Sequence, residues 1–232
     1  MVSRARRSRH SSRKERAGFR LGIVGVVIAA ILGIGCLGTA GVCFAWLQDL
    51  PDYTDASAYN VAEKTKVYAS DGTTLLAELY LENRDPIELS EMGEYVTKGT
   101  VATDERYYDH NGVDLLGIAR AAWVNITGTG HEGASTITQQ FVRNTILSEE
   151  MQESTLKRKV REAYIAIQLE QMYSKDEILQ MYLNTINYGQ GAYGIQAAAE
   201  LYFSKNAKDL TIAEAATLIG IPQAPTYNNP ID

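Results

Sequence analysis

Cysteine is scarce in this chain of 232 residues, which contains only Cys36 and Cys43. Both lie inside one apolar run, so a disulfide scaffold and a cysteine zinc site are excluded for the rest of the chain. Histidine is also scarce, and His110 has no second histidine or cysteine at metal-ligand spacing. With only five prolines and no short repeat, collagenous and solenoid folds are excluded, and we expect most of the chain to fold.

Charge is absent from residues 21 to 47 and divides the chain there. The first 20 residues are strongly basic with Glu15 as their only acid, whereas every other acidic residue follows residue 47. An acidic folded part excludes nucleic acid as its expected partner. We expect the basic tail to set orientation and to contact membrane lipids, with binding of DNA or of a cell-division protein as the alternative.

The uncharged run predicts one transmembrane helix. Its 27 residues would extend about 40 Å as a helix, against a hydrocarbon core of about 30 Å. It ends in Phe44, Ala45 and Trp46 rather than at a small-residue cleavage site, which favours an uncleaved anchor over a signal peptide. The basic residues before it place the N-terminus in the cytoplasm and the remaining chain outside. Gly25, Ala29 and Gly33 form a small-residue stripe suited to packing on a second copy or another membrane protein.

The exported part begins with a linker over residues 48 to 62. Residues 66 to 76 then predict a β-hairpin, because Asp71-Gly72 separates two strand-like runs. From about residue 90 onward the apolar spacing is helical, so this part is expected to be mainly α. We expect Asp114 and Ser135 to cap two helices, and three more to start near Leu156, near Lys175 and at Thr211.

Three segments carry candidate chemistry. Glu162 shares a helix face with Ile165, Ala166 and Leu169, so its carboxylate either serves a function or pairs with Arg158 or Lys159. Residues 133 to 144 gather hydroxyls, carboxamides and an arginine, which suit sugar and phosphate groups, although a solvated helix face explains the same composition. Residues 103 to 114 offer carboxylates beside His110, for which a structural role is the simpler explanation.

Taken together, these stretches resemble the peptidoglycan glycosyltransferase domain (glycosyltransferase family 51) of class A penicillin-binding proteins and monofunctional peptidoglycan glycosyltransferases. The motifs occur in the family's order over about residues 65 to 230. They are residues 104 to 114, 133 to 144, 158 to 162, 175 to 194 and 210 to 225.

The resemblance implies a mainly α, lysozyme-like, two-lobed domain at the outer face of the bacterial cytoplasmic membrane. It implies polymerisation of lipid II into β-1,4-linked glycan with inversion, in which a base deprotonates the acceptor hydroxyl as lipid diphosphate leaves. The implied partners are lipid II, the growing glycan and other cell-wall synthesis proteins. The implied cofactor is a divalent metal, Mg or Mn, near Glu162, with no organic cofactor.

The family's functional residues carry over with one departure. Glu162 matches the second family carboxylate, and the diphosphate and donor contacts are Ser135, Thr138, Gln139, Gln140, Arg143, Arg158 and Lys159. The slot of the family's base glutamate holds Thr103, whose hydroxyl is no base at neutral pH. Asp104 is the nearest carboxylate and becomes the candidate base, whereas Glu105 lies on another side of a helix.

The domain division that follows is a tail over 1–20, a membrane helix over 21–47, a linker over 48–62 and the glycosyltransferase domain over 63–232. Because the chain stops at Asp232, we expect a truncated C-terminus and no transpeptidase domain. Two alternatives stay open. One is a catalytically impaired relative that binds lipid II or acts as a scaffold, and the other is a lysozyme-like hydrolase.

Overall fold

The computed structural model describes residues 38–54, 65–79, 82–104, 106–128, 130 and 133–231. The chain divides into two units, Met1–Asp49 and Leu50–Asp232. In the first unit, residues 38–46 are helical. No helix among the described residues has the length and apolar character needed to cross a membrane. The basic tail, the small-residue stripe and residues 21–37 of the expected membrane helix lie outside the described part, as do residues 55–62 of the expected linker.

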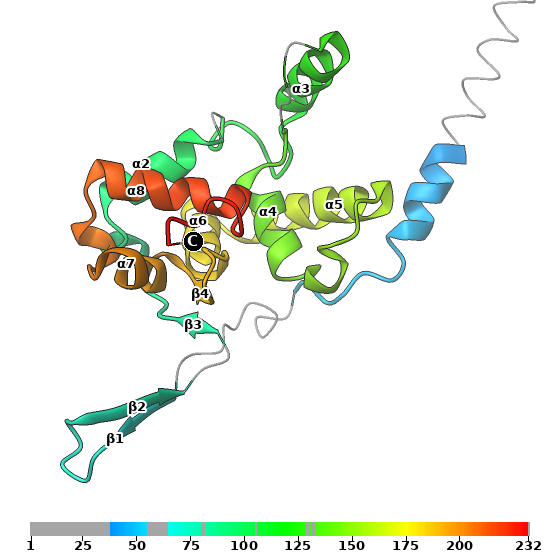
Figure 1. The fold of residues 1–232 in the computed structure, drawn as a ribbon. Helices are drawn as coiled ribbons and strands as arrows, with labels where there is room; N and C mark the ends of the chain where they lie inside the picture. The colour runs from blue at the N-terminus through cyan, green and yellow to red at the C-terminus, as the bar shows by residue number, and fades with distance from the viewer. Residues whose placement is uncertain are drawn as a thin grey trace, which may run out of the picture. The chain divides into compact units, whose positions relative to one another are not determined.

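The second unit is mainly helical, as the sequence predicts (Figure 1). Its α-helices are α2 (Glu94–Ala102), α3 (Leu115–Thr127), α4 (Ile137–Asn144), α5 (Leu156–Met172), α6 (Lys175–Thr185), α7 (Ile195–Phe203) and α8 (Ile212–Gly220). Short 3-10 turns are η2 (Leu89–Glu91), η3 (Ser148–Glu150), η4 (Ala207–Asp209) and η5 (Ile221–Gln223). The strands among the described residues are β1 (Thr65–Tyr68), β2 (Leu75–Leu79), β3 (Asn83–Arg84) and β4 (Ala192–Tyr193).

Local sequence signals explain where three of these helices begin. In each, a hydroxyl side chain accepts a hydrogen bond from the third helical N–H while the residue there bonds back to the cap backbone. These reciprocal pairs are Thr136 with Gln139, Ser174 with Glu177 and Thr211 with Glu214. The prediction that Ser135 caps α4 is therefore wrong by one residue, because Thr136 makes this bond.

The core forms where α4 packs against α5 and α6, while α2 packs against α8. Phe141 of α4, Ile165 and Leu169 of α5 and Leu183 of α6 are fully buried there. The first turn of α4 and the inward face of α5, which carry most of the candidate site residues, are thus fixed by the core itself.

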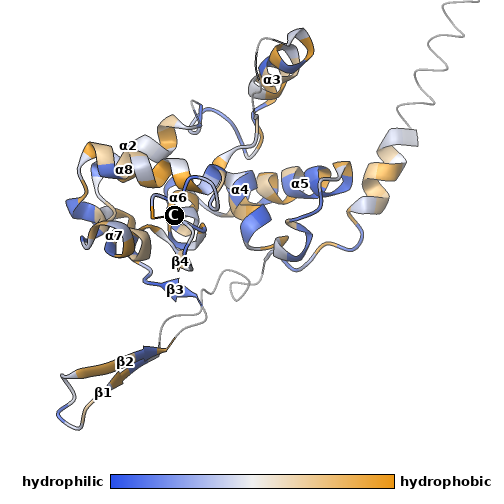
Figure 2. Cartoon of the chain, in the orientation of Figure 1, coloured by the Kyte–Doolittle hydropathy of each residue, from blue (hydrophilic) through white to orange (hydrophobic). Residues whose placement is uncertain are grey.

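The predicted hairpin is confirmed. β1 and β2 pair antiparallel with Val67 opposite Ala77. The turn is held by the Asp71 carboxylate, which accepts bonds from the backbone N–H of Thr73 and of Thr74, both at 2.9 Å. Gly72 has φ 71° there, a conformation that favours glycine. Figure 2 shows apolar residues along both strands and polar residues at the turn.

A second, two-residue pairing joins distant parts of the sequence and was not predicted. β3 and β4 pair in parallel, with Asn83 opposite Ala192 and Arg84 opposite Tyr193. The Arg84 guanidinium lies 4.5 Å from the centre of the Tyr193 ring. Nearby, Asn184 accepts from the N–H of Ile87 at 3.1 Å and donates to its carbonyl at 2.9 Å. Two-residue strands leave no periodic pattern, so the sequence could not reveal them.

Helix α3 presents most of its apolar side chains to solvent. Leu115, Leu116 and Ile126 are exposed, and Trp123 is 71% exposed. Only Gly117 and Ala121 of this helix are buried. Asp114 stands at the cap position as predicted but makes no capping bond, because its carboxylate pairs with Arg106.

Candidate active site

The first turn of α4 organises the site, because a carboxylate and a backbone turn both bond to it. Asp104 Oδ2 accepts a 3.1 Å hydrogen bond from the N–H of Ile137, where the helix dipole favours negative charge. The Thr136 hydroxyl donates to the carbonyl of Gly112 at 2.7 Å. These bonds hold the 104–114 segment against α4.

Gly112 allows this segment to lie directly on α5. Its φ is 79°, and a Cβ there would approach the backbone of Ala166 and Ile167 to 2.6 Å. No side chain fits at that distance. The glycine therefore sets how closely the candidate base segment approaches the helix that carries Glu162.

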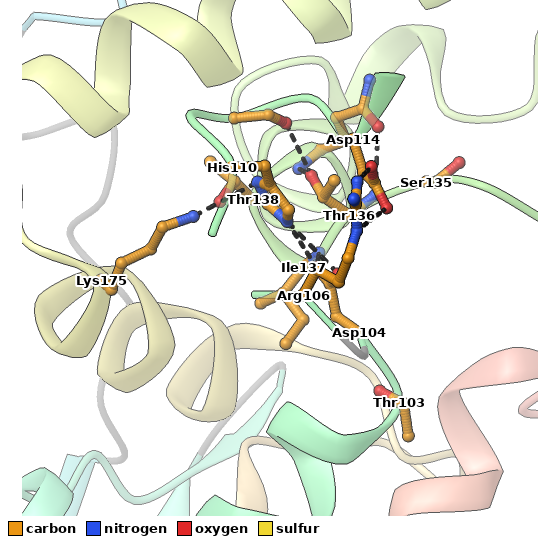
Figure 3. A network of polar contacts seen from close by, with 12 residues as sticks. Thr103, Asp104, Arg106, His110, Asp114, Ser135, Thr136, Ile137, Thr138 and Lys175 are labelled. Carbon is orange, nitrogen blue, oxygen red and sulfur yellow. Dashed lines mark hydrogen bonds and ion pairs between the residues drawn. The ribbon is translucent and has the colours of Figure 1, made fainter. Parts of the chain in front are cut away.

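Thr103 lies at the C-terminal end of α2 and is exposed. Its hydroxyl donates to the carbonyl of Thr100 at 2.7 Å, which satisfies the end of that helix. Thr103 stands apart from the bonded network that includes Asp104 (Figure 3). Glu105, the other carboxylate considered from the sequence, lies outside the described residues.

A cavity of about 270 Å³ opens beside these residues. Its lining comes from the end of α2, the 104–114 segment, the start of α3 and the residues preceding α4. The polar and charged groups include Thr103, Asp104, Arg106, Arg120 and Ser135. Hydroxyl, carboxylate and guanidinium groups that line one cavity can contact both a sugar hydroxyl and a phosphate.

Ser135 links this cavity to Glu162. The Lys159 ammonium donates to Ser135 Oγ at 2.9 Å and to Glu162 Oε2 at 2.8 Å. Arg158 Nε lies 3.1 Å from Glu162 Oε1. Glu162 is 0% exposed, whereas the Lys159 side chain keeps 39% of its surface exposed. The ion pair foreseen from the helical spacing is thus present, with its cationic end open to solvent.

The remaining predicted substrate residues separate into different surroundings. Thr138 is fully buried and donates to Glu170, and Gln139 serves in the cap of α4. Gln140 accepts from the Tyr182 hydroxyl at 3.2 Å. Arg143 lines a second cavity of about 340 Å³, formed with Arg84, Asn144, Tyr193 and residues near η5. Ser135 and Arg143 therefore face different hollows, while Thr138 and Gln139 support α4 from inside.

Burial also raises the pKa of Tyr182, whose hydroxyl donates to Gln140. Removal from water raises the pKa of Tyr182 to about 12, although the Arg143 charge lowers it. The hydroxyl therefore stays protonated at neutral pH and donates to Gln140.

Sequence reasoning missed two charged residues, Glu170 with a side chain that is 3% exposed and Lys175 with one that is 17% exposed. Lys175 and Glu170 lie 2.8 Å apart across the junction of α5 and α6. Lys175 Nζ lies 3.3 Å from Nδ1 of His110 and 4.6 Å from the centre of the Tyr107 ring. One signal was available for Glu170, since it stands four residues after the buried Ala166 on α5. No sequence pattern linked Lys175 to His110, 65 residues away.

The donor set at Glu162 does not fit a divalent cation. The carboxylate is fully buried and already faces the cationic groups of Arg158 and Lys159. Among the described residues, no three His, Cys, Asp or Glu side chains gather as metal ligands. Two cations around one carboxylate suit an anion such as a diphosphate instead.

Comparison with known proteins supports the resemblance to this family. A family model described as Transglycosylase matches residues 71–232. Penicillin-binding protein 1A of Rickettsia felis is 39% identical over 209 residues, which is 88% of this chain and 26% of that protein. Penicillin-binding protein 2D of Bacillus subtilis is 44% identical over 91% of this chain and 31% of its own length. Penicillin-binding protein 1A of Vibrio cholerae is 43% identical over 88% of this chain and 24% of its own length. The chain thus spans about a quarter to a third of these relatives.

Proposed function

Because the chain belongs to the transglycosylase family, we propose that it is a membrane-anchored peptidoglycan glycosyltransferase. It polymerises lipid II into β-1,4-linked glycan with inversion and releases lipid diphosphate. The observation that carries this proposal is the cavity at the first turn of α4, which contains Asp104 and is joined through Ser135 to Lys159 and Glu162.

The proton of the acceptor hydroxyl goes to Asp104 in this mechanism. As the acceptor oxygen attacks C1 of the donor sugar, the bond from C1 to the diphosphate breaks and its electron pair leaves with the phosphate oxygen. Among the described residues, Oδ1 of Asp104 faces only His110, whereas Oδ2 also holds the N–H of Ile137. Oδ1 is therefore the oxygen assigned to receive the proton.

The leaving diphosphate gains negative charge and needs nearby cations more than it needs an acid. Lys159 is half-exposed and fixed between Ser135 and Glu162, so its ammonium is oriented before the substrate arrives. Glu162 and Arg158 position this ammonium from the buried side. Arg143 contacts the substrate from the second cavity, which it lines. No step of the mechanism uses a metal ion.

We also propose how the chain is anchored in the membrane and how its catalytic unit is arranged. The apolar run of residues 21–47 anchors the chain with its N-terminus in the cytoplasm, and the exposed apolar side chains of α3 suit a second contact with lipid. The catalytic unit has a two-lobed, lysozyme-like arrangement. Besides lipid II and glycan, the partners are membrane lipids and, through the small-residue stripe, a second copy or another cell-wall synthesis protein.

Polymerisation of labelled lipid II by the detergent-solubilised chain tests the activity. The chain is compared with a variant in which Glu is inserted between Thr103 and Asp104, and with Asp104→Asn. Glycan from the parent but not from Asp104→Asn supports Asp104 as the base. Glycan from the insertion variant alone identifies a lipid II-binding relative with a disabled base, which a lipid II binding measurement on the parent then confirms.

Topology needs a separate measurement, because activity in detergent does not report it. Alkaline phosphatase fused after Asp232 is active only when exported, so an active fusion supports the proposed orientation. A fusion that stays inactive while a cytoplasmic reporter at the same position works would contradict it.

A further inference from the structure

A ring of polar contacts closes on the first turn of α4, and Figure 3 shows the part of it that Asp104, His110 and Lys175 form. We call the polar ring the set Asp104, His110, Lys175, Glu170 and Thr138. Both oxygens of Asp104 lie 3.3 Å from Nε2 of His110, and Nδ1 of His110 lies 3.3 Å from Lys175 Nζ. Lys175 donates to Glu170 at 2.8 Å, and Thr138 donates to Glu170 at 2.5 Å. Because Asp104 also accepts from the N–H of Ile137, both ends meet on adjacent residues of α4.

The ring joins four parts of the chain at a buried place. The His110 side chain is 4% exposed and that of Glu170 is 3% exposed. Around the ring the charges alternate, with carboxylates at Asp104 and Glu170 on either side of the Lys175 ammonium. Buried charges are tolerated when each has partners, and removal of one partner leaves the next uncompensated.

The contacts fix which nitrogen of His110 carries hydrogen. A lysine ammonium has donors and no acceptor, so Nδ1 of His110 accepts from Lys175 through its lone pair. The neutral ring then carries its hydrogen on Nε2, where it donates to Asp104. Lys175 thereby orients the ring for Asp104, and Glu170 holds Lys175.

We propose that His110 is a positioning residue that fixes the Asp104 carboxylate on the first turn of α4, and that Lys175 and Glu170 hold it in the Nε2–H form. The ring sets the distance between the candidate base and Ser135, which precedes that turn. The catalytic consequence rests on the proposed function, whereas the tautomer and the held carboxylate do not.

The tautomer is measured first, on the complete parent chain in detergent. Selective ¹⁵N labelling of histidine gives three sets of signals, because the chain has three histidines. The double substitution His10→Gln and His131→Gln leaves only the signals of His110. We expect a hydrogen on Nε2 and none on Nδ1, and we expect Lys175→Met to abolish this preference. Lys208→Met is the matched control, since Lys208 is exposed. A hydrogen on Nδ1 in the parent would overturn the proposal.

The held carboxylate is measured through amide exchange. Gln at position 110 can supply one donor and one acceptor, whereas Leu has a similar size and supplies neither. We expect His110→Leu to speed exchange at the Ile137 N–H about tenfold or more, which is the loss of one hydrogen bond to a charged group. His110→Gln should stay within a few fold of the parent, and the amides of Ile165 and Leu169 should not change in either variant.

Lipid II kinetics give the third readout. A displacement of about 1 Å at a reacting group lowers the rate about a hundredfold. We therefore expect kcat to fall roughly 10- to 100-fold in His110→Leu with little change in KM, and to recover in His110→Gln. An equal fall in kcat in both variants, with an unchanged exchange rate at the Ile137 N–H, would contradict the role of His110 as a positioning residue. If the parent does not polymerise, the tautomer and the exchange rates still decide the question, so failure of the proposed function remains distinguishable.

Discussion

Replacing Glu162 by Gln should have two separable effects. It should destabilise the protein, because a buried counter-charge is lost, and it should stop the reaction, because Glu162 positions the Lys159 ammonium. The substitution keeps the shape of the side chain but leaves Arg158 and Lys159 without their counter-charge. Removing one partner of a buried ion pair costs about 3–5 kcal/mol. Because 39% of the Lys159 side chain is exposed and can be hydrated, the lower end, about 3 kcal/mol, is expected. For a domain of this size, that loss lowers Tm by roughly 6–12 °C.

The assay is thermal unfolding of the detergent-solubilised chain, followed by circular dichroism at 222 nm. Glu94→Gln is the matched control, since Glu94 pairs with Lys98 at 2.8 Å on an exposed helix face, and we expect no measurable change in its Tm. A Tm for Glu162→Gln within about 2 °C of the parent would refute the reasoning from burial.

A double variant separates stability from function. Replacing Arg158 by Met and Glu162 by Leu fills the same volume without a buried charge, and such exchanges are often neutral or stabilising. We expect this variant to regain much of the Tm lost in Glu162→Gln while lipid II polymerisation stays absent. Recovery of both properties would mean that Glu162 has a structural role alone.

Three further outcomes follow from individual contacts. Gly112→Ala should lower the free energy of unfolding by about 3 kcal/mol, measured by urea unfolding, because its Cβ would lie 2.6 Å from Ala166 at a φ of 79°. Hydrogen bonds lower the pKa of Asp71 from 3.8 to about 2. They therefore stabilise the hairpin turn fully above pH 3.8, and this stabilisation is lost as the pH falls through 2. NMR titration of the turn amides measures this transition, and Asp71→Asn should remove it. In a Trp46→Phe background, brominated lipid vesicles should quench Trp123 fluorescence, whereas unchanged emission would exclude contact of α3 with lipid.

The sequence predicted elements whose determinants are local. The hairpin turn at Asp71 and the starts of α5, α6 and α8 were predicted because caps and apolar spacing act within one or two helical turns. The contact of Lys159 with Glu162 was predictable for the same reason, since residues three apart share a helix face. The start of α4 was missed by one residue because two adjacent hydroxyls, Ser135 and Thr136, compete for one cap.

What the sequence could not predict depends on tertiary packing. Thr138 and Gln139 were predicted to contact the substrate, yet one is buried against Glu170 and the other closes a helix cap. The meeting of His110 with Lys175 requires the 104–114 segment to lie against the start of α6, and no periodic pattern encodes a contact over that separation. The roles of Asp104 and Glu162 in the reaction stay predictions.

The parallel pairing of β3 with β4 constrains the order in which the chain can fold during synthesis. Asn83 and Arg84 leave the ribosome more than 100 residues before their partners Ala192 and Tyr193. Until then the early segment has neither its strand partner nor Asn184, which bonds to both backbone groups of Ile87. Local helices such as α5 can form earlier, because their contacts close short loops. The pairing therefore forms only after Tyr193 has been synthesised, and a stall before residue 193 leaves Asn83 and Arg84 without their strand partners.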